Sequence, residues 1–235
     1  MNEYKYFSYF YDDVVAKVKY KDWLDFIRPY LTPNSSILDL ACGSGTLAIL
    51  LKLNGYDVEG LDLSESILKM AKEKTKMHHL VIPYHLANMT NFNLNKKYDV
   101  ITCFFDSINF LKNKTEIEEL FASVYQHLNP NGLFIFDVFS KRMLKHYKHH
   151  KFTLKAPTHQ LIWKTKTKKP NLLIHEIKIK ESEETFLETY KEYYHDMSLF
   201  SSHQFSLEKL SGDFKDTLDK KDERILFVMK KSYEE

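Results

Sequence analysis

The sequence predicts an α/β fold in which a doubly wound, mainly parallel sheet is followed by an antiparallel β insertion before its last strands. Three observations predict it. A strand–loop–helix–strand unit occupies residues 37–62, strand and helix patterns alternate as far as residue 140, and the hydrophobic period falls to two between residues 151 and 194. Alternating strands and helices build parallel sheets, whereas period-two segments joined by short turns build antiparallel sheets with one solvated face.

The first unit has the local chemistry of a nucleotide-cofactor site. Residues 37–40 suit one buried parallel strand, and a helix over 46–53 and a second strand over 56–61 complete the unit. Between the first strand and the helix stand only small residues: Ala41, Cys42, Gly43, Ser44 and Gly45. Such residues let the backbone turn sharply and approach a ligand closely. Asp62 ends the second strand, where a carboxylate can accept both hydroxyls of a ribose lying across the crevice.

Two cofactor classes use such a unit. Gly43, Gly45 and Ala48 fit the G-x-G-x-x-A pattern of dinucleotide-binding proteins, with Asp62 at nearly the expected spacing of roughly 20 residues. Asp39 argues against a dinucleotide, because an anion close to the loop would repel a pyrophosphate. S-adenosylmethionine (SAM) instead carries an ammonium, a sulfonium and a ribose. The charge pattern therefore favours SAM, and an NAD-dependent oxidoreductase remains the alternative.

The next elements are predicted from their hydrophobic period and their end signals. Apolar residues at helical spacing predict three helices, over 12–31, 65–76 and 115–128. Ser64 is a good N-cap for the second of these helices. Short apolar runs predict the third, fourth and fifth strands, over 80–86, 98–105 and 133–138. An Asn-Pro-Asn-Gly turn at 129–132 precedes the fifth strand.

The hydrophobic period changes to two after residue 151. Apolar and polar residues alternate in three segments, 161–168, 172–181 and 185–194, with a Lys-Pro-Asn turn after the first. A short helix is expected over 205–210, and a closing core strand over 224–230. No linker-like composition flanks residues 151–194, so we expect this insertion to belong to the same folding unit as the parallel sheet.

Three motifs resemble those of the class I SAM-dependent methyltransferases. They are D-L-A-C-G-S-G-T-L-A at 39–48, G-L-D-L-S-E-S-I-L at 60–68 and L-N-P-N-G-L-F-I-F-D at 128–137. The opening Y-x-x-F-x-x-x-Y-D at 4–12, followed by Y-x-x-W at 20–23, resembles a small bacterial branch that acts mostly on small molecules. The resemblance implies a Rossmann-like sheet of seven strands, SAM as cofactor, and methyl transfer to an N or O of a small-molecule acceptor.

The resemblance also implies which residues surround the cofactor. The glycine loop would face the methionine part of SAM, Asp62 the ribose, and Asn88 and Met89 the adenine, although the family often has Asp at the position of Asn88. Phe104 and Phe105 end the fourth strand, where open α/β sheets bind ligands. The full set of candidate cofactor residues is Tyr11, Tyr20, Trp23, Asp39, Ala41, Cys42, Gly43, Gly45, Asp62, Leu63, Asn88, Met89, Phe104 and Phe105.

By the same resemblance, the N-terminal segment folds over the cofactor as a lid. Tyr11 would face the sulfonium or the substrate, and Tyr20 and Trp23 the methionine carboxylate, with core packing as the alternative for these two. Tyr11 and Asp106 are the candidate catalytic residues, because Asp106 could bind a substrate amine or take its proton. Capping of the following turn is the alternative for Asp106, and a non-catalytic SAM-binding module is the alternative for the protein.

The acceptor pocket is expected between the insertion and the aromatic lid. Residues 151–194 would form one wall and the N-terminal segment the other, with Tyr11 and Asp106 facing each other across the pocket. Enclosure is expected because a methyl donor open to water positions nothing for reaction. The alternative is that the insertion is a dimer interface.

A single domain, 1–235, is the expectation for the chain. Its 235 residues, 28.0 kDa and 43% hydrophobic content suit one full core. We divide it into a lid and helix, a SAM-binding core, the β insertion and closing elements of the core sheet: 1–31, 35–140, 151–194 and 205–231.

Composition also bears on compartment and partners. No apolar run reaches the ~18 residues of a membrane span, and the first residues lack the apolar stretch of a signal peptide. Cys42 and Cys103 both fall in the expected parallel sheet, which indicates a reduced cytoplasmic setting without disulfides. The eleven histidines lack partners at metal-ligand spacing. A net charge of +2, and the lack of an N-P-P-Y or D-P-P-Y motif, argue against nucleic acid, while a homodimer remains open.

Overall fold

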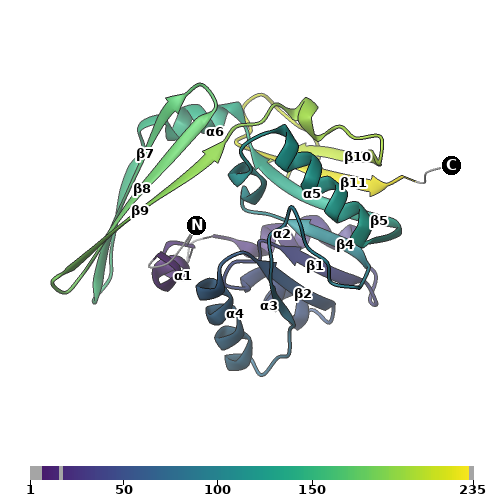
Figure 1. Cartoon of the computed structure of the whole chain (residues 1–235), viewed down its shortest axis with the longest axis horizontal. Helices are drawn as coiled ribbons and strands as arrows, with labels where there is room; N and C mark the ends of the chain where they lie inside the picture. The colour runs from purple at the N-terminus through teal and green to yellow at the C-terminus, as the bar shows by residue number, and fades with distance from the viewer. Residues whose placement is uncertain (1–6, 16–17, 233–235) are drawn as a thin grey trace.

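Two β-sheets form the framework of the computed structural model, which describes residues 7–15 and 18–232 (Figure 1). The larger sheet has seven strands in the order β10 (Phe205–Gly212), β11 (Arg224–Lys231), β5 (Leu128–Phe139), β4 (Tyr98–Cys103), β1 (Ser36–Leu40), β2 (Asp57–Asp62) and β3 (Tyr84–Leu86). The smaller sheet has four, in the order β6 (Lys151–Lys155), β7 (His159–Lys169), β8 (Leu172–Glu181) and β9 (Glu184–Tyr193).

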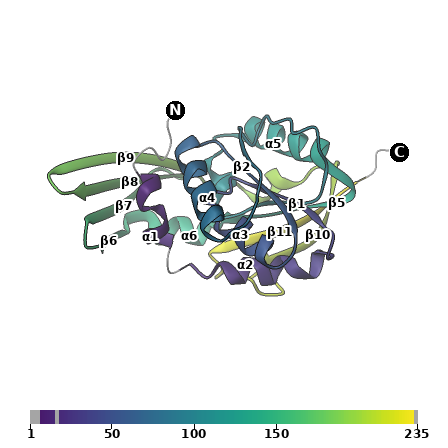
Figure 2. The ribbon, with the colours of Figure 1, turned by 90° about the horizontal axis from the view of Figure 1, so that it is seen from below.

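Helices cover both faces of the seven-stranded sheet. The α-helices are α1 (Tyr11–Val15), α2 (Tyr20–Ile27), α3 (Thr46–Leu53), α4 (Glu65–Met77), α5 (Lys114–His127) and α6 (Lys141–His146). Buried apolar residues of α2 and α3 pack with Ile37, Val58 and Val100 on one face of the sheet, whereas α5 packs with Leu38 and Ile101 on the other. Figure 2 shows α2 and α5 on opposite sides of the sheet. Because neighbouring strand residues point to opposite faces, the sheet is apolar on both sides.

The strand directions confirm the predicted doubly wound fold with its insertion. The pairs β1–β2, β1–β4, β2–β3 and β4–β5 are parallel, and β11 and β10 add to β5 as antiparallel strands. The four insertion strands are antiparallel throughout. Three of them were expected, and β6 is an additional strand. Among the described residues, no helix is long and apolar enough to cross a membrane.

The single N-terminal helix expected over 12–31 is wrong. Two separate helices, α1 and α2, take its place, and Val18 and Lys19 between them are not helical. Pro29 lies in a short 3₁₀ turn, Arg28–Tyr30, which follows α2. The break has a tertiary cause: α1 turns aside to place Asp12 against Ser44 and Lys74, and a continuous helix would forgo these polar contacts.

The helix expected over 205–210 is also wrong, because this segment is strand β10. It pairs with β11 along its whole length, with one bulge between Leu207 and Lys209. The third strand is shorter than expected: it begins only at Tyr84, after Pro83, which has no N–H to give to the ladder. In addition, β5 begins at Leu128 and includes the expected turn, around which its register with β4 shifts.

Candidate active site

The loop between β1 and α3 can take its path only with glycine at two positions. Gly43 and Gly45 have φ angles of +54° and +75°, which glycine adopts most readily. A Cβ atom on Gly45 would lie 2.4 Å from the hydroxyl oxygen of Tyr84 and 3.1 Å from Cβ of Ala71. The loop is tied to the next strand because Cys42 N donates to the carbonyl oxygen of Leu61 at 3.0 Å. Backbone therefore lines this part of the sheet edge.

Asp62 joins the glycine loop to the start of α4. Its two carboxylate oxygens accept hydrogen bonds from Gly43 N and Ser64 N, each at 2.9 Å. The Ser64 hydroxyl in turn accepts from Ile67 N, which confirms Ser64 as the N-cap of α4. The Asp62 carboxylate is thereby held at the carboxyl end of β2.

A cleft of about 570 Å³ opens at this edge of the sheet. Among the predicted cofactor residues, its lining includes Tyr11, Ala41, Gly43, Asp62, Leu63, Asn88, Met89 and Phe105. The Asn88 side chain accepts from Thr90 N at 3.0 Å, which orients it beside the third strand. Leu63 and Leu86 line the cleft and remain more than half exposed. Exposed apolar side chains at a cleft are typical of a ligand site.

Four other predicted residues surround a much smaller space beside the cleft. Tyr20, Asp39, Cys42 and Phe104 line it together with Tyr11 and Phe105, and its volume of about 10 Å³ has room for roughly one water molecule. Trp23, Gly45 and Asp106 line neither space. Trp23 instead stacks on Phe105 at 4.2 Å between ring centroids, and its indole N–H donates to Asp137 at 2.8 Å. The structure therefore places Trp23 beneath the site.

Asp39 is the most unusual acid of the site. Its side chain is 3% exposed and accepts a hydrogen bond from the Thr102 hydroxyl at 2.7 Å. Burial raises the pKa of Asp39 to about 7, and the charge of Asp62 adds to this rise. Burial also raises the pKa of Tyr20 to about 12 and that of Tyr11 well above its ordinary value. Both tyrosines consequently stay protonated at neutral pH.

Polar contacts fasten the N-terminal segment to the glycine loop. Asp12 accepts from the Ser44 hydroxyl at 2.7 Å and forms an ion pair with Lys74 at 3.0 Å. Lys74 also donates to the Thr46 hydroxyl at 2.7 Å, so one ammonium joins α4, α3 and α1. On its other side, the segment packs Phe7 and Phe10 against apolar residues of the insertion sheet. Tyr4, which opens the Y-x-x-F-x-x-x-Y-D pattern, lies outside the described residues.

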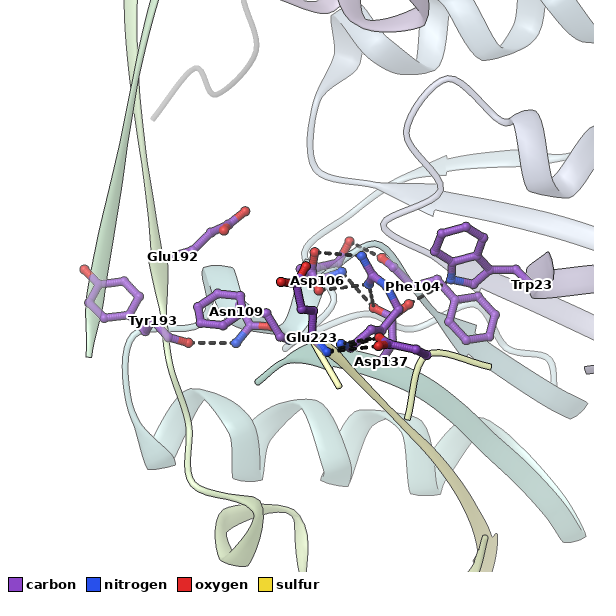
Figure 3. Close-up of polar contacts among 12 residues, drawn as sticks. Trp23, Phe104, Asp106, Asn109, Asp137, Glu192, Tyr193 and Glu223 are labelled. Atoms are coloured by element: carbon purple, nitrogen blue, oxygen red, sulfur yellow. Dashed lines mark hydrogen bonds and ion pairs between the residues drawn. The ribbon is translucent and has the colours of Figure 1, made fainter. Parts of the chain in front are cut away.

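Asp106 is held in a buried charge network rather than in the cleft. Both of its carboxylate oxygens accept from the guanidinium of Arg224, at 2.9 and 3.1 Å, and Arg224 also pairs with Asp137 at 2.8 Å. Asp106 N donates to Asp137 at 2.8 Å (Figure 3). Burial raises the pKa of Asp106, and the charge of Arg224 opposes that rise. The expectation that Asp106 faces Tyr11 across the pocket is wrong, because Arg224 occupies its carboxylate.

The expected insertion wall also needs correction. No residue of 151–194 lines the cleft; the insertion packs behind the N-terminal segment, and only that segment, through Tyr11, reaches the cleft. Asn109, in the loop after β4, is fully buried. Its amide donates to the carbonyl oxygen of Tyr193 at 2.8 Å and accepts from Phe139 N, which links the loop after β4 to β9 and β5 (Figure 3).

Several residues that line the cleft are not among the cofactor candidates expected from the sequence. They are Leu61, Ser64, Glu65, Ser66, Ile67, Leu86, Ala87, Ser107 and Phe110. Most of them stand within a few residues of Asp62 or Asn88, so adjacency to a strand end was an available signal. Phe110 had no comparable signal, because it enters through a 3₁₀ turn, Ser107–Phe110. Among the described residues, no three metal-ligating side chains are grouped to hold a metal ion.

Comparisons with known proteins identify the family. Residues 37–132 match the family model described as a methyltransferase domain. A crystal structure of a SAM-dependent methyltransferase from Clostridium acetobutylicum ATCC 824 superposes with a TM-score of 0.84 and 26% identity, over 99% of this chain and all of that one. A protein of Bacillus subtilis (strain 168) described as "Putative methyltransferase" is 30% identical over 97% of each chain. The chain belongs to the class I SAM-dependent methyltransferases.

Two further relatives of this methyltransferase match over part of their length. One, described as "Putative methyltransferase" in Geobacillus sp. (strain WCH70), is 34% identical over 61% of this chain and 60% of its own. The other is the dTDP-3-amino-3,4,6-trideoxy-alpha-D-glucopyranose N,N-dimethyltransferase of Streptomyces venezuelae, 32% identical over 48% of this chain and 46% of its own. Family membership resolves the cofactor choice: this methyltransferase uses SAM rather than NAD.

Proposed function

We propose that this methyltransferase transfers the methyl group of SAM to an N or O of a small-molecule acceptor, and that the acceptor atom is an amine nitrogen. The observation that carries the choice of nitrogen is the chemistry of the lining residues that come from the N-terminal segment and from the loop after β4, which we take as the acceptor end of the cleft. These residues are Tyr11, Phe105, Ser107 and Phe110, and they include no carboxylate, histidine or lysine. A hydroxyl acceptor gains from a general base, whereas a neutral amine already has a nucleophilic lone pair.

The rest of the cleft fits SAM residue by residue. We assign Asp62 to the ribose hydroxyls, because two backbone amides hold its carboxylate at the carboxyl end of β2, where it lines the cleft. Asn88 and Met89 are assigned to the adenine, beside the exposed apolar side chains of Leu63 and Leu86. The loop from Ala41 to Gly45 is assigned to the methionine part of SAM.

Asp39 indicates whether this part of the site suits the methionine part of SAM. Asp39 is a buried carboxylate that accepts a hydrogen bond from one hydroxyl, and its pKa is raised to about 7. Among the described residues it forms no ion pair, so a positive charge beside it would be stabilising. The ammonium of SAM would supply that charge beside the small space that Asp39 and Tyr20 line. Occupation of that space requires the side chains of Tyr11 and Tyr20 to shift, since its volume of about 10 Å³ has room for only about one water molecule.

When bound, SAM supplies an electrophilic methyl group on a sulfonium. Tyr11 contributes by facing the place where the glycine loop meets the acceptor end, where its ring can stabilise a cation by ~0.5–2 kcal/mol. Its raised pKa keeps the phenol protonated, so Tyr11 orients by donating a hydrogen bond and does not remove a proton. Phe105 and Phe110 exclude water around the reacting atoms, which keeps the donor and acceptor in line.

Asp106 receives a changed role in this proposal. With both oxygens bound by Arg224, it holds the loop that carries Phe105 and Ser107, and it is a positioning residue. The N-terminal segment, fastened through Asp12, serves as the lid over the cofactor. The amino-sugar methyltransferase of Streptomyces venezuelae acts on a small amine by its name, which supports the same acceptor class here.

The test is methyl transfer from labelled SAM to matched pairs of small acceptors. Each pair consists of an amine and the alcohol that has the same carbon skeleton, and the product S-adenosylhomocysteine is measured alongside. We expect turnover with members of the amine set, and none with their alcohol partners. Preference for alcohols would contradict the amine assignment. Tight SAM binding without turnover on either set or on a metabolite extract would instead favour a non-catalytic SAM-binding module.

A further inference from the structure

The insertion sheet separates its charges by face. Directly paired residues of antiparallel strands share a face, so the register assigns every strand residue to one side. One face carries Leu161, Ile177 and Tyr190 and packs against the N-terminal segment. The opposite face carries eight lysines: Lys151, Lys155, Lys164, Lys166, Lys169, Lys178, Lys180 and Lys191. We call this second side the lysine face.

Carboxylates on the lysine face neutralise almost none of its positive charge. Glu176 is its one carboxylate, and it pairs with Lys166. Within the described part of the chain, the other seven lysines form no ion pair. Glu188 and Glu192 lie on the packed face instead, where Glu192 pairs with His175. The lysine face therefore has a formal charge of +7, and since the whole chain has +2, the remainder of the protein sums to −5.

The lysine charges on this face repel one another unless a negatively charged partner lies against them. Lys151 and Lys164 are directly opposite each other, and Lys166 and Lys191 flank Ile174 on both sides. Like charges directly opposite in a sheet are destabilising. Ile174, between Lys166 and Lys191, is only 6% exposed. Figure 1 shows β7, β8 and β9 extending away from the seven-stranded sheet, which leaves room for a large partner.

We propose that the lysine face binds the phosphate backbone of a nucleic acid, without sequence preference. Lysine rows along the strands repeat at ~7 Å, which spreads point charges over an extended, flat area. Contacts of this kind neutralise phosphates and release counterions, and they do not read bases. The face carries no arginine and only one aromatic residue, Tyr193, at its end, so base stacking and bidentate base contacts have no suitable donors.

Other occupants fit the lysine face less well. Protein interfaces are depleted of lysine at their centre, and a membrane site needs apolar side chains that enter the lipid. Leu187 is the one strongly exposed apolar residue of this face. A second copy of the chain would place lysines against lysines. This inference departs from the sequence-based expectation against nucleic acid, which used the net charge and could not see its segregation. It stands apart from the proposed acceptor, because the lysine face is on the side opposite the N-terminal segment.

The experiment measures fluorescence anisotropy of a labelled mixed-sequence RNA of about 20 nucleotides, over salt from about 50 to about 200 mM. The test variant, Lys164→Gln/Lys178→Gln/Lys191→Gln, changes one lysine on each of three strands. The control variant, Lys69→Gln/Lys72→Gln/Lys76→Gln, removes the same charge from exposed positions of α4. Thermal midpoint and SAM affinity, measured for both variants, show that the fold and the cofactor cleft are intact.

We expect the test variant to bind RNA at least about tenfold more weakly and to reduce the slope of log affinity against log salt by about 2, and the control to change affinity less than about threefold. Equal losses in both variants would overturn the proposal, as would the absence of RNA binding by the parent protein at about 50 mM salt. Binding to phosphatidylserine vesicles without RNA binding would assign the face to a membrane surface. A dimer in sedimentation that the test variant stabilises would assign it to a second copy.

Discussion

Asp39 and Asp62 show how two carboxylates on neighbouring strands acquire different chemistry. Asp39 is buried in the sheet, where burial raises its pKa to about 7 and the Thr102 hydroxyl donates a hydrogen bond to it. Asp62 lies at the end of β2, half-buried, with two backbone amides holding its oxygens. The difference follows from burial. Asp39 is deeply buried and would be stabilised by a positive charge, whereas Asp62 is oriented as a hydrogen-bond acceptor by two amides.

Replacement of Asp62 by alanine should weaken SAM binding by roughly tenfold to a few hundredfold. The carboxylate would otherwise accept two ribose hydroxyls, and a hydrogen bond to a charged group contributes ~1.5–3 kcal/mol. Calorimetric titration with SAM measures the loss, and Asp25→Ala, which removes an exposed carboxylate of α2, is the matched control. Unchanged affinity in Asp62→Ala would refute the ribose assignment.

Asp39 should make SAM binding depend on pH. The ionised form is the one that attracts an ammonium, so affinity should rise up to about tenfold per pH unit as pH approaches 7, and level off above it. For stability the sign is opposite: the raised pKa favours the fold fully below the ordinary value of 3.8, and this contribution is lost as pH rises through about 7. Asp39→Asn should flatten both profiles. If Asp39→Asn shows the same pH dependence of SAM affinity as the parent protein, Asp39 is not the group that causes it.

The loop after β4 is the element on which the acceptor end depends. Phe105 and Asp106 both have φ angles of +60°, a conformation that costs non-glycine residues of order 1–3 kcal/mol each. Arg224, Asp137 and Asn109 hold this loop through buried polar contacts with strands β11 and β5. The strain is therefore balanced by long-range contacts, and Phe105 is presented at the cleft as a consequence.

Arg224→Gln should destabilise the fold and weaken SAM binding together, although Arg224 lines neither space of the site. Removal of one partner from a buried ion pair costs ~3–5 kcal/mol, because the other charge is left uncompensated. Arg224→Lys keeps the charge but loses the bidentate geometry, so it should recover part of the loss. Thermal midpoints and SAM affinities of both variants measure this, with the exposed Arg142→Gln as control.

A second substitution tests whether Arg224 acts through Asp106. The double variant Asp106→Asn/Arg224→Gln removes both charges, and should be more stable than Arg224→Gln alone. Its SAM affinity should nevertheless stay low, since the loop has lost its anchor. Full recovery of SAM affinity in the double variant would contradict a positioning role.

Lys74 fastens the lid element to the glycine loop, and its removal should loosen the lid. The half-buried contacts with Asp12 and Thr46 indicate a contribution near 1 kcal/mol after solvent screening, so Lys74→Gln should speed SAM release roughly three- to tenfold. Lys72→Gln, two residues earlier on α4 and exposed, is the matched control. Stopped-flow displacement of SAM gives the rate of SAM release. Equal release rates in both variants would argue against a role of the Lys74 contacts in holding the N-terminal segment.

At the scale of the whole molecule, we propose that both sheets belong to one cooperative domain. The loop after β4 reaches the insertion where Asn109 bonds to Tyr193, and His195 bonds to the carbonyl oxygen of Leu111 at 2.9 Å. The N-terminal segment adds a second connection, because Phe7 packs against Trp163 with 5.3 Å between ring centroids. Contacts on both sides of the insertion should couple its unfolding to that of the core.

The two tryptophans test this cooperativity directly. Trp23 lies in the core beneath the cleft and Trp163 in the insertion sheet. In the single-tryptophan variants Trp23→Phe and Trp163→Phe, the remaining indole reports urea unfolding of one sheet, and circular dichroism reports the whole. We expect each fluorescence midpoint to coincide with the dichroism midpoint of the same variant. An earlier fluorescence transition at Trp163 would mean that the insertion unfolds independently.

Some elements were misjudged from sequence because tertiary pairing outweighs local pattern. Residues 205–210 have helix-compatible spacing, but β11 offers a complete partner, and pairing with it converts the segment to an edge strand. The N-terminal helix pattern was likewise real in both halves, and only the contact of Asp12 with Lys74 and Ser44 separates them. The free energy from local helix propensity is small compared with that of a set of long-range hydrogen bonds.

The gathering of the glycine loop and Asp62 at one cleft was predictable, because the signals for it are local. A strand, a glycine loop, a helix and an acid at the next strand end occur within residues 37–62, and each position depends on backbone geometry that sequence specifies directly. The acceptor half depends on pairs distant in the chain. Arg224 and Asp106 are 118 residues apart, and no local rule indicates that they meet or that Asp106 is thereby withheld from the cleft.

Charge shows the same division at the largest scale. The sequence by itself determined the net charge of the chain, which is +2 with lysine as the main cation. Its alternating strand patterns also determined that neighbouring strand residues point to opposite sides of a sheet. Only the tertiary structure decided which side became packed, because that choice depends on Phe7 and Phe10 docking from the other end of the chain. Once one face is buried by those aromatic residues, every strand lysine must lie on the other, since an unpaired ammonium is too costly to bury.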